Sequence, residues 1–138
     1  MAQKFTDLAG TLYVMNVLSG ADHESGTISN LDVDALETLV EIDVTYAKVL
    51  YVQFTVAVAS LTDFNVDYRA HVSGTYFNVA SVAGDYTTPN APVLKASGDL
   101  TASAAGSHWL KLDVEGVESV RLQAAGTSST VVGYWGSN

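Results

Sequence analysis

Apolar and polar residues alternate along much of this chain, and the alternation is clearest over residues 49–79. In VLYVQFTVAVA (49–59), apolar residues occupy every second position from Val52, while Gln53 and Thr55 lie between them. Successive side chains of a β-strand point to opposite faces of a sheet, so a period of two is typical of a half-buried strand. The pattern therefore predicts consecutive strands that pack on a shared core.

The segment FNVDYRAHV (64–72) alternates in the same way. We expect one set of its side chains to face the core and the other set to face outward. The inward set is Phe64, Val66, Tyr68, Ala70 and Val72, and the outward set is Asn65, Asp67, Arg69 and His71. A turn at Ser73-Gly74 then leads into a third strand.

Strand-like segments recur about every ten residues after Thr38, which is the spacing of a β-sandwich or barrel. Turns that contain glycine separate them, because tight connections need the positive φ that glycine adopts freely. The predicted strands are 38–45, 49–59, 63–72, 75–81, 92–96, 108–114, 119–125 and 130–135. No alternation of strand and helix patterns is present, which disfavours a parallel sheet. We therefore predict an all-β fold, a jelly-roll-like antiparallel β-sandwich of about eight strands.

Residues 1–37 lack this regular rhythm. Thr11–Leu18 (TLYVMNVL) reads as one strand, and the acidic and polar sequence that follows has weak periodicity. We divide the chain into an extended N-terminal arm, 1–37, and a β-sandwich domain, 38–138. In this prediction the arm pairs with the sheet edge or with a neighbouring subunit. The alternative is that it supplies an edge strand, or the first strand or two, of the same sandwich.

The composition is that of a single domain without cysteine. Of the 138 residues, 48% are hydrophobic, which is enough to build a core. Fifteen acidic and six basic residues give a net charge of −9, so the phosphate backbone of nucleic acid would repel the chain. The absence of cysteine excludes a disulfide, a thiolate nucleophile and a cysteine-based zinc site. We also expect no secretory signal and no membrane span, because no apolar run is suited to either.

The sequence contains no catalytic motif: a GxSxG elbow, a phosphate-binding loop and a paired-histidine metal motif are all lacking. Asp32, Asp34 and Glu37 superficially resemble a calcium loop, but the segment lacks the central glycine that such a loop needs. We expect these carboxylates to form a solvated edge. No cofactor, metal or enzymatic activity is expected.

Aromatic residues give the clearest indication of a binding surface. Tyr76 and Phe77 are adjacent, as are Tyr134 and Trp135, so each pair should place one ring in the core and one outside. Tyr51 lies on the polar side of its strand. Exposed aromatic rings are common at protein interfaces and in sugar-binding sites, although rings at a sheet end often only cover that end.

The run 49–81 resembles a pattern of many small virion proteins of tailed bacteriophages. In that pattern a hydrophobic strand, an alternating strand and a glycine-containing turn precede an aromatic-bearing strand. The later segments 109–126 (WLKLDVEGVESVRLQAAG) and 129–135 (STVVGYW) resemble the closing strands of the same sandwich. Arg121 matches an arginine of the penultimate strand.

The resemblance implies a non-enzymatic capsid decoration (cement) protein with a jelly-roll-like sandwich. Such a protein would be made in the host bacterial cytoplasm and would lie on the capsid surface of the virion. It would bind the major capsid protein of the same virus and would associate with itself as a homotrimer, without nucleic acid or a membrane as partner. The candidate interface residues are Phe5, Leu12, Tyr13, Val14, Tyr51, Arg69, His71, Tyr76, Tyr134 and Trp135.

The alternative function is that of a carbohydrate-binding β-sandwich module, because exposed tyrosine and tryptophan rings stack on sugars. This hypothesis predicts glycan binding that depends on Trp135 and Tyr76. A head-tail connector or tail component is a further alternative within the virion. A glycan lyase or hydrolase is a third class, for which no acid/base constellation is visible.

Overall fold

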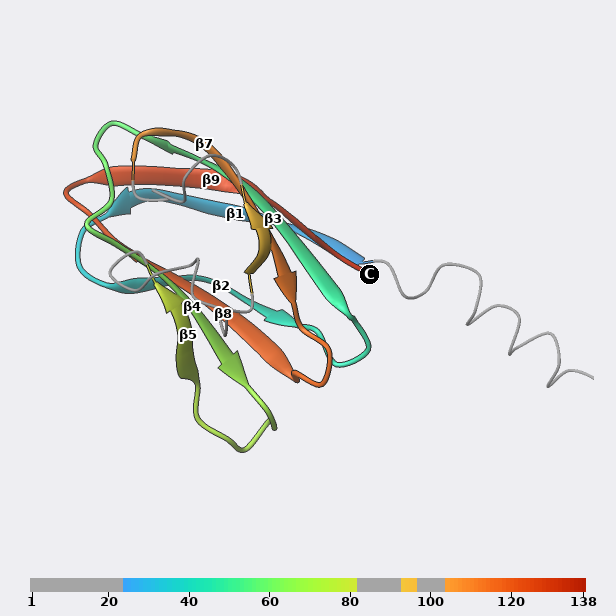
Figure 1. The fold of residues 1–138 in the computed structure, drawn as a ribbon. Coiled ribbons are helices and arrows are strands. Elements are labelled where there is room, and N and C mark those ends of the chain that lie inside the picture. Colours follow the sequence, from blue (N-terminus) through green and yellow to red (C-terminus); the bar gives the residue numbers. More distant parts are fainter. Residues whose placement is uncertain (1–23, 82–92, 97–103) are drawn as a thin grey trace, which may run out of the picture.

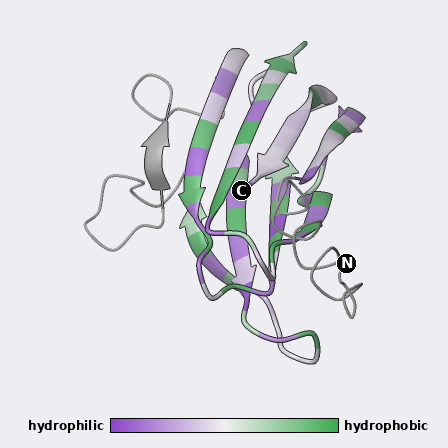
Figure 2. Ribbon diagram, turned by 90° about the vertical axis from the view of Figure 1, so that its right-hand side faces the viewer, coloured by the Kyte–Doolittle hydropathy of each residue, from purple (hydrophilic) through white to green (hydrophobic). Residues whose placement is uncertain are grey.

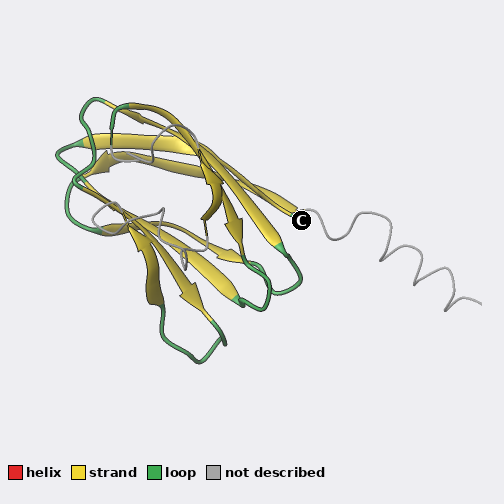
Figure 3. Cartoon of the chain, viewed as in Figure 1, coloured by secondary structure: helices red, strands yellow, loops and turns green. Residues whose placement is uncertain are grey.

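The computed structural model describes residues 24–81, 93–96 and 104–138, and every regular element in these ranges is a β-strand (Figure 3). Within these ranges, then, no helix is available to cross a membrane. The strands are β1 (Glu24–Val33), β2 (Glu37–Asp43), β3 (Val49–Ala57), β4 (Asp63–Arg69), β5 (Phe77–Ser81), β6 (Val93–Ala96), β7 (Gly106–Asp113), β8 (Ser119–Ala125) and β9 (Ser129–Ser137).

The strands form two facing sheets (Figure 1). One sheet has five strands in the order β1-β9-β3-β7-β6, and the other has four in the order β2-β8-β4-β5. Each pair of neighbouring strands in the described residues is antiparallel. The predicted all-β antiparallel sandwich is confirmed, with nine described strands where about eight were expected.

The strand pairing is nested. If β6 is set aside, the first strand pairs with the last (β1 with β9) and the second with the last but one (β2 with β8). Inside these pairs, β3 pairs with β7 and β4 with β5. A long antiparallel hairpin wound into two sheets produces this order, which is that of a jelly roll. β6 extends the five-stranded sheet beyond β7.

Alternate residues of the strands fill the space between the sheets. In β3, Leu50, Val52, Phe54 and Val56 are buried and the residues between them are exposed, as the period of two predicts. The prediction that Val58 continues this inward row is wrong, because β3 ends at Ala57 and Val58, with a φ of 72°, is 80% exposed. Bands of hydrophobic and hydrophilic residues alternate along the strands in Figure 2. The buried face of β3 therefore follows directly from its sequence.

Aromatic side chains from the two sheets meet in the core. The rings of Phe54 (β3) and Phe64 (β4) stack with 4.8 Å between their centroids and 11° between their planes. The hydroxyl of Tyr68 in β4 donates a hydrogen bond of 2.5 Å to the backbone carbonyl oxygen of Asp113 in β7. Burial raises the pKa of Tyr68, and the charge of Asp113 raises it further, so the phenol stays protonated and keeps this bond at neutral pH.

The region before β2 includes a strand of the sandwich. Residues 24–30 of β1 pair in register with residues 131–137 of β9. Of the two possibilities given for residues 1–37, this pairing matches the one in which the region supplies an edge strand of the sandwich. Residues 1–23, which include the candidate strand Thr11–Leu18, lie outside the described residues.

The face assignment of β4 is partly wrong. The apolar residues Phe64 and Val66 are buried as predicted, but β4 ends at Arg69, and both Ala70 and Val72 are exposed in the loop that follows. The strand period stops applying where the backbone leaves the sheet. Asp67 faces outward as predicted, yet it is only 3% exposed, because side chains of β5 and β8 bond to it on the outer face.

Candidate functional site

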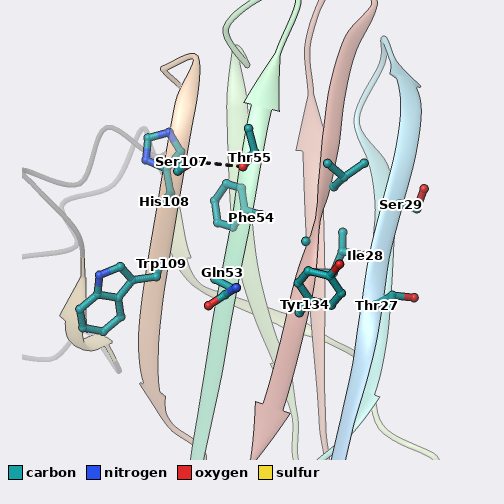
Figure 4. A pocket seen from close by; sticks show the side chains of 12 residues that line it. Thr27, Ile28, Ser29, Gln53, Phe54, Thr55, Ser107, His108, Trp109 and Tyr134 are labelled. Atoms are coloured by element: carbon teal, nitrogen blue, oxygen red, sulfur yellow. Dashed lines mark hydrogen bonds between the residues drawn. The ribbon is translucent and has the colours of Figure 1, made fainter.

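The outer face of the five-stranded sheet carries a row of four side chains on four neighbouring strands. Gln53 of β3 is paired with Trp109 of β7 on one side and with Tyr134 of β9 on the other. Tyr134 is paired in turn with Thr27 of β1. Residues that are directly paired in antiparallel strands point to the same face, so the four side chains form one continuous row (Figure 4).

A second row crosses the same strands two residues away. Thr55 pairs with Ser107 on one side and with Val132 on the other, and Val132 pairs with Ser29. The hydroxyl oxygens of Thr55 and Ser107 are 3.1 Å apart and share a hydrogen bond (Figure 4). These side chains are small, so they leave an open hollow of about 670 Å³ beside the aromatic row.

A third row lies on the other side of the aromatic row. Tyr51 pairs with Lys111 and with Gly136, and the Lys111 ammonium nitrogen lies 5.5 Å from the centroid of the Tyr51 ring. At that distance the ammonium is attracted to the face of the ring. A smaller hollow of about 310 Å³, bordered by Tyr51, Trp109 and Tyr134, adjoins the first one. We call the two hollows together the outer groove.

Gly133 lies at the floor of the outer groove, where β9 closely approaches β3. A Cβ atom at this position would lie 2.0 Å from the carbonyl oxygen of Gln53 and 2.6 Å from the Cα atom of Phe54. Neither of these atoms can move without moving the β3 backbone. Glycine is therefore required for β9 to lie against β3 as it does.

The outer groove combines exposed aromatic rings with uncharged polar groups. Tyr134 is 61% exposed, Tyr51 45% and Trp109 37%. No aspartate, glutamate, lysine or arginine is among the described residues that border the larger hollow, although the whole chain has a net charge of −9. The groove can therefore stack on flat apolar surfaces and exchange neutral hydrogen bonds.

His108 also borders the larger hollow, but its ring is engaged on the core side of β7. The ring centroid lies 5.4 Å from that of Phe54, and Nε2 lies 2.6 Å from the carbonyl oxygen of Ala104. Its neighbour Leu110, two residues along the strand, is buried in the core. The chemistry that the groove offers is that of a binding surface.

Trp135 faces the opposite side of β9 from Tyr134. It packs against the hydrophobic core, and its indole covers Gly26, where an added Cβ atom would lie 2.5 Å from the indole Nε1. Adjacent positions in a strand predicted one ring inside and one outside for this pair, and the structure confirms it. The ring offered to solvent is that of Tyr134.

A second cluster lies on the outer face of the four-stranded sheet, where Tyr76 is held between two arginines. The guanidinium carbons of Arg69 and Arg121 lie 4.7 Å and 4.4 Å from the centroid of the Tyr76 ring. The Tyr76 hydroxyl lies 2.7 Å from Oγ of Ser119, and Arg69 donates a hydrogen bond of 2.9 Å to Glu118. Each of these groups is thus engaged within the chain.

Asp67 lies beneath this cluster with both carboxylate oxygens bonded. Arg121 donates to Oδ2 from Nε at 3.0 Å and from Nη2 at 2.9 Å, and Asn78 donates to Oδ1 at 3.1 Å. Charge-assisted bonds of this kind are stronger than neutral ones. The cluster ties β4, β5 and β8 together, and we interpret it as support for the fold.

The expectation that Tyr76 and Phe77 place one ring in the core is wrong. Tyr76 lies over the two arginines, and Phe77 is 70% exposed. Phe77 begins β5, the edge strand of this sheet, and pairs with Tyr68 at the end of β4. Its ring stays exposed at this corner, while the next residue, Asn78, faces outward onto Asp67. β5 contributes Ala80 to the core instead.

The candidate interface residues are spread over several surfaces. Tyr51 and Tyr134 border the outer groove, whereas Arg69 and Tyr76 lie on the opposite sheet. His71 is exposed in the loop after β4. The candidates that lie outside the described residues are Phe5, Leu12, Tyr13 and Val14.

Trp109 was missed as a site residue. The signal was present, because Leu110 and Leu112 take the inward positions of the same strand and the period of two then places Trp109 outward. Its partners in the row, Gln53 and Tyr134, come from strands that are distant in sequence. Only the strand register brings these three side chains together.

Asp34 and Glu37, near the β1–β2 turn, accept hydrogen bonds from other residues of the chain. Asp34 accepts hydrogen bonds from the amide of Ser128 at 2.8 Å and from its hydroxyl at 3.3 Å, which ties this turn to the β8–β9 turn. Glu37 accepts a bond of 2.6 Å from Asn30. In the part of the chain that the structure describes, no group of three histidine, aspartate or glutamate side chains is placed to hold a metal ion.

No protein-family model and no curated protein sequence matches this chain. Solved structures with a similar chain trace include the SPBc2 prophage-derived protein YomS, with a TM-score of 0.49, 10% identity, and coverage of 83% of this chain and 93% of that one. The VP2 subviral particle of infectious bursal disease virus gives a TM-score of 0.42 and 14% identity over 83% of this chain and 32% of that one. The family 29 carbohydrate-binding module CBM29_1 from Piromyces equi gives a TM-score of 0.40 and 11% identity over 86% of this chain and 83% of that one. The structures that this chain resembles thus include a prophage-derived protein, a viral particle protein and a carbohydrate-binding module.

Proposed function

We propose that this chain is a structural protein of a tailed-bacteriophage virion, which decorates the outer surface of the capsid and reinforces it. The role is non-enzymatic. The partners in this proposal are the major capsid protein of the same virus and further copies of the chain, arranged as a homotrimer.

The open edge of β1 is the observation that supports this proposal most directly. β1 is ten residues long and pairs on one side with β9, and none of the described residues pairs with its other side. Between Ser25 and Leu31 it contains no charged residue and no proline, which are the features that protect edge strands from unwanted pairing. An extended segment of another subunit can add to such an edge through main-chain hydrogen bonds.

The residues that precede β1 join the sandwich at one particular end. Glu24 pairs with Ser137, so residues 1–23 connect where β9 finishes. Tyr46, which is 93% exposed in the turn between β2 and β3, lies at the same end, because the amide of Lys48 bonds to the carbonyl oxygen of Asn138. This end is suited to attachment, since it places the exposed Tyr46 ring beside the start of the open edge strand.

On a virion lattice, no single contact between this chain and the shell needs a high affinity. Many copies held in a symmetric array bind with avidity even where single contacts are weak. The net charge of −9 meanwhile limits non-specific association in the cell.

Reconstitution on shells tests the proposal. We expect the purified protein to bind assembled shells that lack it, and to bind free major capsid protein much more weakly. Leu31→Lys puts a charge on an exposed apolar position of the open edge and is expected to lower shell affinity at least about tenfold. The occupancy is measured by co-sedimentation and gel densitometry.

Thr75→Lys is the matched control, because it adds the same charge at an exposed neutral position on the β4–β5 loop. It should bind shells as the parent does. Full occupancy by both Leu31→Lys and a variant that lacks residues 1–23 would contradict attachment through this edge and this end. Light scattering in solution tests the homotrimer separately, with three times 14.5 kDa as the expected mass.

A further inference from the structure

We propose that the outer groove binds an uncharged glycan chain, which lies across strands β7, β3, β9 and β1. This activity is additional to capsid decoration and uses a different surface from the open edge of β1. On a virion it would give the particle an affinity for polysaccharide.

The aromatic row supplies the stacking surface. Tyr134 and Trp109 flank Gln53 on the two neighbouring strands, so their Cα atoms are separated by two strand spacings, roughly 10 Å. Tyr51 adds a third ring in the adjacent row. The apolar faces of sugar rings pack on flat aromatic side chains, and rings at this separation favour a chain of linked sugars over a single one.

Short polar side chains supply the hydrogen bonds. Gln53 lies between the two rings, with Thr27 and Thr55 beside them, and Ser107 shares a bond with Thr55. Amides and hydroxyls can both donate and accept, as sugar hydroxyls do. A groove that alternates rings with such groups matches a ligand whose faces are apolar and whose rim is hydroxylated.

The charge distribution selects for a neutral ligand. Among the residues that the structure describes, those that border the larger hollow include no carboxylate, ammonium or guanidinium group, and the Lys111 ammonium at one end lies over the Tyr51 ring. The rest of the molecule is strongly acidic, which opposes the approach of an anionic polysaccharide. Binding of a neutral glycan should accordingly change little with ionic strength.

The test uses the full chain labelled with ¹⁵N and titrated with a defined panel: cellohexaose, mannohexaose, laminarihexaose, chitohexaose and, as an anionic member, hexameric hyaluronan. We expect saturable amide shifts centred on Gln53, Thr55 and Tyr134 with at least one neutral member. Tyr134→Ala and Trp109→Ala should each weaken that binding at least about tenfold. Affinity should be the same within about a factor of two at 50 and 500 mM NaCl.

Phe77→Ala and Tyr46→Ala are the matched controls, because each removes an exposed ring elsewhere on the molecule. They should bind the glycan as the parent does. Trp109 is the less exposed of the two test residues, so Gln53→Ala is a further variant in case Trp109→Ala unfolds. The proposal is overturned if no neutral member binds, if binding is confined to hyaluronan and falls with salt, or if Tyr134→Ala binds as the parent does.

Discussion

At the scale of single residues, the fold depends most clearly on the ion pair between the buried Asp67 carboxylate and Arg121. Asp67 is 3% exposed, and Arg121 and Asn78 together bond both of its carboxylate oxygens. A buried carboxylate that loses its ionic partner keeps its desolvation cost without the compensating attraction. Arg121 was singled out in the sequence through the phage resemblance, and the structure gives it this physical role.

Arg121→Met is expected to lower the free energy of unfolding by about 3 kcal/mol, because it leaves the Asp67 carboxylate without its ion pair. Equilibrium unfolding in urea measures the change. Lys111→Met, which removes a basic residue on the other sheet, should stay within about 0.5 kcal/mol of the parent. The double variant Asp67→Asn/Arg121→Met should recover most of the loss, and an Arg121→Met protein as stable as the parent would refute the assignment.

The contacts of the Asp43 carboxylate determine the direction in which it changes the stability of the fold with pH. The Thr45 hydroxyl donates to the Asp43 carboxylate at 2.6 Å and the Thr45 amide at 3.0 Å, and these bonds lower the pKa of Asp43 below its ordinary value of 3.8. A carboxyl group whose pKa is lowered on folding stabilises the native state above the unfolded pKa, and this contribution is lost as the pH falls through the folded pKa.

Thr45→Ala is therefore expected to destabilise the protein at pH 7 by less than about 1 kcal/mol, because the Thr45 side chain is exposed. The difference from the parent should shrink as the pH falls below the unfolded pKa of Asp43 and through its lowered folded pKa. Urea unfolding at a series of pH values measures it. A difference that stayed constant across this range would show that the hydroxyl does not act through the Asp43 charge.

At the scale of elements, the contact between β3 and β9 sets the geometry of the outer groove. Gln53 of β3 is paired with Trp109 of β7 and with Tyr134 of β9, and Gly133 allows β9 to approach β3 closely. The alternation of the sequence places side chains on the right face of each strand. The register between strands then decides which of those side chains are neighbours.

Gly133→Ala is expected to lower the free energy of unfolding by about 1–3 kcal/mol, because its Cβ atom would overlap the β3 backbone. Thermal unfolding followed by circular dichroism measures the change. Val132→Ala, one residue away and partly exposed, should alter stability by no more than about 0.5 kcal/mol. If the two variants unfold at the same temperature, the close approach of β9 to β3 at Gly133 is not needed for stability.

At the scale of the whole molecule, the jelly roll is closed by β1, which pairs with the last strand of the chain. Residues 24–33, which the sequence assigned to the N-terminal arm, are therefore a strand of the sandwich. Residues 24–30 hold one edge of the five-stranded sheet.

Deletion of residues 1–23 is expected to leave the unfolding temperature within about 4 °C of the parent, since every described strand remains. Deletion of residues 1–30 removes most of β1 and should lower it by well over that amount, because one side of β9 and the core around Val131 become exposed. Calorimetry on both variants measures the effect. Equal unfolding temperatures for the two deletions would contradict the role of β1 in closing the fold.

Much of the fold could be predicted from the sequence, because burial and strand formation share a period of two. The inward positions of β3 are those that the alternation assigns, and the strand 119–125 has the predicted bounds. β1 was not recognised, because its sequence ESGTISNLDV has few apolar residues and only Ile28 and Val33 are buried. An edge strand with one buried face gives a weak signal, and pairing with β9 stabilises it.

The sequence alone determined the all-β class, the inward face of the central strands and the neutral, aromatic character of the residues that became the outer groove. Only the tertiary structure decided the order of the strands, and with it the row that joins Trp109, Gln53 and Tyr134. It also decided that Trp135 and Tyr76 are engaged within the chain while Tyr134 is free to meet a ligand. The physical reason is that alternation is a local property of each strand, whereas register depends on contacts between segments far apart in the sequence.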